Sequence, residues 1–194
     1  MGGIALLAGA VSLLLKKGSS GHKKAGKLFY YSMLISALAA FIVAVLPNHE
    51  NPFLFSIGLF STYFLVSGRR SLYYKQQDFQ IQPDIIIAYL ILLTGICMLL
   101  YPLLFSRSLN IVLLVFGIVA IRFGIRDLRL LKNTSLLRNK WLKLHVGKMT
   151  GGYIAAVSAF FVVNQILPGI WNWFIPGIIG SAYIAYWIKK LKTK

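Results

Sequence analysis

Apolar residues along this chain fall into seven long runs, which short polar or basic segments separate. The runs cover residues 2–15, 28–46, 53–67, 84–105, 109–121, 149–166 and 171–188. An α-helix rises about 1.5 Å per residue, so a run of about 20 residues matches a hydrocarbon core about 30 Å thick. The pattern therefore predicts an all-α fold, a polytopic membrane bundle of seven transmembrane helices.

Composition supports this prediction. The chain is 58% hydrophobic and only 13% charged, with a mean hydropathy of +0.73. A soluble domain has about half apolar and about a quarter charged residues. The single cysteine, Cys97, lies inside an apolar run and cannot form an intramolecular disulfide.

The basic residues predict the orientation in the membrane. Of the 21 Lys and Arg residues, 20 lie after the first, third, fifth and seventh runs, and only Arg107 lies on the opposite side. Short loops rich in Lys and Arg face the cytoplasm. We therefore expect the N-terminus outside and the C-terminus inside, in the inner membrane of a bacterial cell.

The net charge of +17 also raises the question of whether the chain binds nucleic acid. The position of the charges argues against it, because they lie at the ends of apolar runs and not in one patch. Arg122, Arg126 and Arg129 share one face of a helix that continues beyond the fifth run. Anionic lipid headgroups are the partner we expect for them.

Two stretches of the sequence resemble each other. Gly26-Lys27 and Leu46-Pro47 recur as Gly147-Lys148 and Leu167-Pro168, and each copy begins with a histidine. Many transporters consist of duplicated helix sets. The chain is thus predicted to be one integral membrane domain, residues 1–194, with a parallel 3+1+3 repeat as a hypothesis. Its halves would be residues 1–75 and 106–194, and its connector residues 84–105.

The same stretches carry a family resemblance. His22-Lys-Lys-Ala-Gly-Lys and His145-Val-Gly-Lys-Met-Thr-Gly-Gly-Tyr, with Val163-Asn164 and Leu167-Pro168, resemble segments of an uncharacterised family of bacterial multi-pass membrane proteins, grouped as a domain of unknown function. The resemblance implies a membrane protein and brings no activity with it.

His22 and His145 are the candidate cofactor ligands. Both begin a helix on the basic side, where the helix N-terminus favours the uncharged imidazole. A neutral imidazole can ligate haem or relay a proton. A solvated or headgroup-contacting histidine is the alternative, and their place at the rim argues against a haem buried in the core.

Other polar groups are candidates for a ligand cavity between the helices. They are Asn164, Ser158, Ser181 and Tyr183. Small residues every fourth position predict close helix packing instead. They are Ser32, Ser36, Ala40 and Ala44 in one helix and Gly147, Gly151, Ala155 and Ala159 in the other.

Acidic residues are few. Glu50, Asp78, Asp84 and Asp127 all fall in loops or at run ends, so no carboxylate is expected in mid-membrane. No paired catalytic carboxylates, metal-spaced Cys/His cluster, Walker loop or nucleophile elbow occurs in the sequence. An enzymatic function is therefore the less favoured hypothesis, and no metal site is predicted.

Three functions remain open at this point. The first is a protein that binds or transports a small molecule or lipid between its helices. The second is a haem-binding electron-transfer protein using His22 and His145. The third is a structural subunit of a membrane complex. A second copy of the chain or another membrane subunit would be its protein partner.

Overall fold

A computed structural model describes residues 1–48, 51–106 and 110–191. Within them the chain is helical and forms no strand. The elements are α1 (Gly2–Leu14), α2 (Ser20–Val45), α3 (Pro52–Arg70), the 3-10 turn η1 (Tyr73–Lys75), α4 (Gln82–Tyr101), the π-turn η2 (Pro102–Ser106), α5 (Ile111–Leu131), α6 (Thr134–Asn164) and α7 (Trp171–Lys190).

Within residues 1–48, 51–106 and 110–191, three helices are long and apolar enough to cross a membrane: α2, α4 together with the turn that follows it, and α6. The shorter α1 is also apolar. Large apolar side chains such as Leu38, Ile42, Leu90 and Ile179 are exposed on the outside of the bundle. An apolar exterior of this extent is expected where lipid replaces water as the solvent. The chain is therefore a membrane protein.

Local sequence explains where several helices begin. The Ser19 hydroxyl accepts a hydrogen bond from the His22 backbone N–H at the start of α2. Asn51, Asn110 and Asn133 do the same with their side-chain oxygens at the starts of α3, α5 and α6. Each cap satisfies a backbone donor that the helix itself leaves unpaired.

The seven predicted runs each correspond to a helix, but several helices extend further. α2 begins at Ser20 and α6 at Thr134, both before their apolar runs. α5 continues to Leu131, as the arginine spacing predicted. Leu109, the predicted start of the fifth run, lies outside the described residues, as do His49, Glu50 and Arg107.

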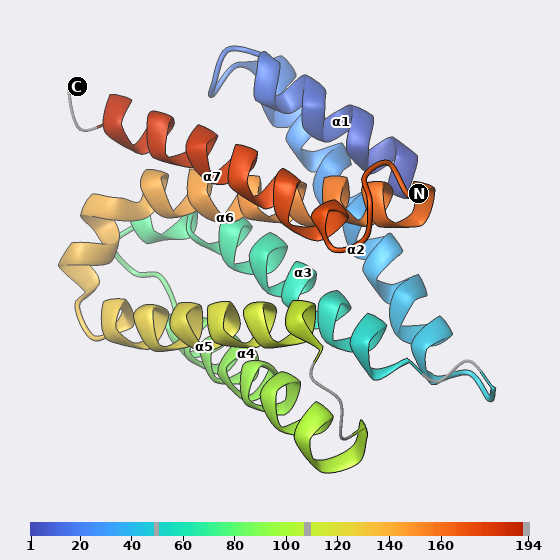
Figure 1. The fold of residues 1–194 in the computed structure, drawn as a ribbon. Helices are drawn as coiled ribbons and strands as arrows, with labels where there is room; N and C mark the ends of the chain where they lie inside the picture. The colour runs from blue at the N-terminus through green and yellow to red at the C-terminus, as the bar shows by residue number, and fades with distance from the viewer. Residues whose placement is uncertain (49–50, 107–109, 192–194) are drawn as a thin grey trace.

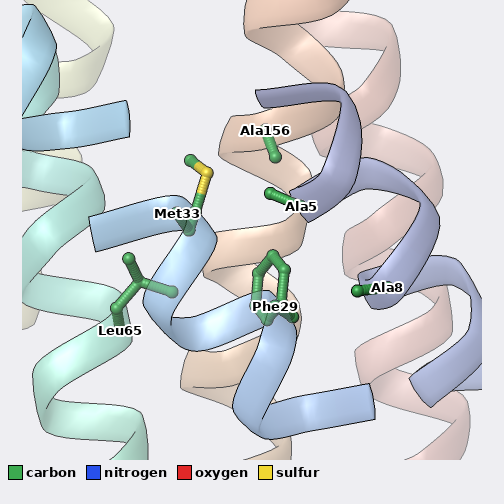
Figure 2. Packing of buried hydrophobic residues seen from close by; sticks show 6 residues of the cluster. All are labelled: Ala5, Ala8, Phe29, Met33, Leu65 and Ala156. Atoms are coloured by element: carbon green, nitrogen blue, oxygen red, sulfur yellow. The ribbon is translucent and has the colours of Figure 1, made fainter. Parts of the chain in front are cut away.

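Successive helices run back and forth, so that one end of the bundle collects the basic connections. Figure 1 shows the α1–α2, α3–α4 and α5–α6 connections at the same end as the C-terminal end of α7. α1 packs on α2 and α6, α3 packs on α2, α4 and α6, and α4 packs on α5. Figure 2 shows one cluster of the core, formed by Ala5, Ala8, Phe29, Met33, Leu65 and Ala156.

Candidate binding cavity

A cavity of about 560 Å³ opens at the basic end of the bundle. Its walls come from α1, α2, α6, the end of α3, η1 and Tyr183 of α7. His22 and His145 both line it, so the packing brings together the two histidines that sequence reasoning selected.

His22 lies in the first turn of α2 and reaches the end of α1. Its Nδ1 is 2.9 Å from the backbone oxygen of Ser12 and 3.2 Å from the Ser12 hydroxyl. Ser12 belongs to the last turn of α1, whose carbonyl groups have no partner within the helix. His22 therefore ties the start of α2 to the end of α1.

His145 does the same between α6 and α3. Its Nδ1 is 2.8 Å from the backbone oxygen of Gly68, in the last turn of α3. The Ser71 hydroxyl donates to this oxygen as well, at 2.7 Å. The two histidines thus make equivalent contacts with the ends of two different helices.

These contacts fix which ring nitrogen carries a proton. A carbonyl oxygen only accepts hydrogen bonds, so Nδ1 must be the donor in both rings. In the neutral imidazole the lone pair is then on Nε2. Among the described residues neither Nε2 atom has a hydrogen-bond partner.

The cavity is strongly basic. Among the described residues, five cationic side chains line it and no Asp or Glu does: Lys17, Lys23, Lys27, Arg69 and Lys75. Aromatic rings position three of them. Arg69 lies 4.7 Å from the centre of the Tyr30 ring, Lys17 lies 5.3 Å from that of Trp187, and Lys75 lies 5.8 Å from that of Trp141.

Lys17, in the connection between α1 and α2, is partly buried. It donates to the backbone oxygens of Ser12 and Leu13. Partial burial lowers the pKa of its ammonium, because a low-dielectric environment disfavours the charged form. An anion bound beside Lys17 would compensate for the hydration that its ammonium group loses on burial.

A buried polar cluster lies between α3, η1, α4, α5 and α6. Asp84, 5% exposed, accepts two hydrogen bonds of 2.8 Å from Arg70 and one of 2.9 Å from the Tyr74 hydroxyl. Burial and the Asp84 charge raise the pKa of Tyr74 well above its ordinary value. The phenol therefore stays a neutral donor.

A second carboxylate has the same kind of partners. Asp127, 8% exposed, accepts hydrogen bonds from the Tyr63 hydroxyl, at 2.7 Å, and from Lys148. The Lys148 ammonium also lies 4.7 Å from the centre of the Tyr63 ring. Asp84, Asp127 and Lys148 share a space of about 10 Å³, which is enough for one water.

The sequence had not indicated this cluster. Asp84 does start a helix, but Asp127 lies within α5, and both side chains are buried. The sequence did offer one sign that Asp127 is buried, because it shares a helix face with the small residues Ala120 and Gly124. Neither its partner lysine nor its tyrosine could be found without the fold.

The four polar residues that the sequence suggested for a ligand cavity lie in different surroundings. Tyr183 lines the large cavity, and its hydroxyl is 3.4 Å from the Leu13 oxygen. Ser158 is buried and lies 3.5 Å from the Trp173 oxygen. Asn164 is exposed, with its amide bonded to the Phe160 oxygen, and Ser181 is exposed as well. Only Tyr183 of these four lines the large cavity.

The small residues that recur at every fourth position of α2 and α6 lie only partly at helix contacts. Ser32, Ala44 and Gly151 are buried, whereas Ser36, Ala40, Gly147 and Ala155 are partly buried and Ala159 is exposed. A Cβ on Gly151 would lie 2.7 Å from the Phe64 ring of α3. The close contact of α6 with α3 therefore needs a glycine at this position.

Comparisons with known proteins give no relative. No protein-family model, no curated protein and no solved structure matches this chain.

Proposed function

We propose that this chain is a seven-span protein of the bacterial inner membrane that binds an amphipathic anion, a small molecule or lipid, in the large cavity. Its N-terminus would be outside and its basic end in the cytoplasm. One observation carries the proposal: in the part of the chain that the structure describes, five Lys and Arg side chains and two histidines line a cavity to which no carboxylate contributes.

Aromatic and aliphatic side chains supply the rest of the lining. Phe29, Tyr30, Trp141, Tyr153 and Tyr183 surround space that extends inward from the charged rim. An anionic headgroup would pair with the cations, and an apolar body would lie against these rings. Binding or transport of such a molecule fits this division of the cavity better than binding of a cation.

The test uses a dansylated long-chain fatty acid as probe, with the alcohol of equal chain length as its neutral match. We expect the full-length protein in nonionic detergent to bind the acid more tightly. The triple variant Lys17→Gln, Lys27→Gln, Arg69→Gln should weaken acid binding about tenfold or more, since each cation near an anionic headgroup contributes about 1 kcal/mol.

The matched control removes three charges elsewhere. Arg122, Arg126 and Arg129 are exposed on α5 and do not line the cavity. The variant Arg122→Gln, Arg126→Gln, Arg129→Gln should bind the acid like the unaltered protein. Equal losses in both triple variants, or equal binding of acid and alcohol, would contradict the proposal.

A further inference from the structure

We propose that His22 and His145 are axial ligands of an iron tetrapyrrole, a cofactor of the haem class, in the large cavity. This inference rests on the proposed function, because such a cofactor is itself an amphipathic anion. It is carried by the placement of two imidazole rings in one cavity, each with the same hydrogen bond to a backbone carbonyl.

The hydrogen bonds prepare both rings for metal ligation. A histidine that binds a metal through one nitrogen almost always donates its other N–H to a carboxylate, a backbone carbonyl or water. The Ser12 and Gly68 oxygens have this role here. Both rings are thereby oriented, and both retain Nε2 as the ligating atom.

A bare metal ion does not fit the same residues. Structural and catalytic zinc sites use three or four protein ligands. Within the described parts of the chain no group of three or more His, Cys, Asp or Glu residues is placed to hold a metal. Five lysine and arginine side chains around the cavity would also repel a free divalent cation.

A tetrapyrrole removes both difficulties. Its ring supplies four nitrogen ligands, so the protein needs to add only the axial ones. Its carboxylate groups bring the negative charge that the cavity lacks. Arg69, Lys17 and Lys27 line the cavity with no carboxylate partner in the described structure, whereas Arg70 and Lys148 are already paired with Asp84 and Asp127.

The depth of the cavity suits a large flat ring. Its lining on α6 extends from Trp141 through His145 to Tyr153. At about 1.5 Å per residue this is about 18 Å along the helix axis. The histidines are near the rim, but the space between the helices reaches further into the bundle.

The test compares hemin with iron-free protoporphyrin IX, which has the same ring and carboxylates but no metal. Both are titrated into the full-length protein in detergent, and absorption and electron paramagnetic resonance spectra are recorded. We expect hemin to give a six-coordinate, low-spin bis-imidazole spectrum. His22→Asn and His145→Asn should each convert it to a high-spin or weakly bound form, with iron-free porphyrin binding unchanged.

The asparagine variants keep a side-chain N–H near the position of Nδ1 for the Ser12 or Gly68 oxygen, and their helical circular dichroism should match the unaltered protein. External imidazole should restore the low-spin spectrum in each. If iron-free porphyrin binds but the hemin spectrum does not depend on either histidine, the inference is wrong and the proposed function stands. If neither porphyrin nor the fatty acid binds, both are wrong.

Discussion

At the scale of single residues, the buried carboxylates of Asp84 and Asp127 are the main electrostatic feature outside the cavity. Each is held by one cation and one tyrosine hydroxyl. Removing a charge from water costs several kcal/mol, which the partner charge and the hydrogen bonds offset. The two clusters therefore depend on complete sets of partners.

Lys148→Met should destabilise the protein by about 3 to 5 kcal/mol, because it leaves Asp127 buried with only the Tyr63 hydroxyl as partner. Adding Asp127→Asn to this variant should restore much of the loss, since the uncompensated charge is then gone. Thermal and denaturant unfolding in detergent measure both effects.

The control is Lys140→Met, which removes an exposed lysine from the same helix. It should change the free energy of unfolding by less than about 0.5 kcal/mol. An equal effect of Lys140→Met and Lys148→Met, or a double variant no more stable than Lys148→Met, would show that the pair is not buried as described.

At the scale of the helices, α4 and α5 approach each other closely through glycines. A Cβ placed on Gly95 would lie 2.8 Å from the Gly117 oxygen and 2.9 Å from the Ile121 nitrogen. Both are backbone atoms, which cannot move aside as a flexible side chain can. The packing of α4 on α5 therefore requires glycine at residue 95.

Gly95→Ala should push α4 and α5 apart and destabilise the protein by about 1 to 3 kcal/mol, the usual cost of overpacking. Gly177→Ala is the matched control on α7, where a Cβ meets nothing within 4 Å. Alanine should be neutral or slightly stabilising there, since it favours helix over glycine. Melting temperatures that fall equally in both variants would contradict the described contact.

At the scale of the whole molecule, the basic connections lie at one end of the bundle (Figure 1). The residues that line the cavity include the basic residues of this end. We infer that this end faces the cytoplasm, because short loops rich in Lys and Arg are retained there. The cavity would then receive its ligand from the cytoplasm or from the inner leaflet.

Cysteine labelling checks this orientation. In a Cys97→Ser background, Gln77→Cys, between η1 and α4, should react with a membrane-impermeant maleimide only after the cells are opened. Asn51→Cys, before α3, should react in intact cells. The reverse pattern would invert the proposed topology.

The sequence was sufficient to predict the helices because long apolar runs have few alternatives in a membrane. It also predicted that His22 and His145 lie at the same end, since their helices run in the same direction. It could not predict the cavity, whose walls depend on how α1, α3 and α6 pack. The Lys148–Asp127 pair was likewise hidden, because nothing in the two local patterns links positions 127 and 148.

The hydrogen bonds of the Gly68 backbone oxygen have a further consequence. It accepts from the His145 ring and from the Ser71 hydroxyl, so both of its lone pairs are occupied. The residues after it have different surroundings: Arg69 lines the cavity, and Arg70 binds Asp84. The Gly68 carbonyl therefore lies where the His145 contact, the cavity lining at Arg69 and the buried Arg70–Asp84 pair meet along one short segment of the chain.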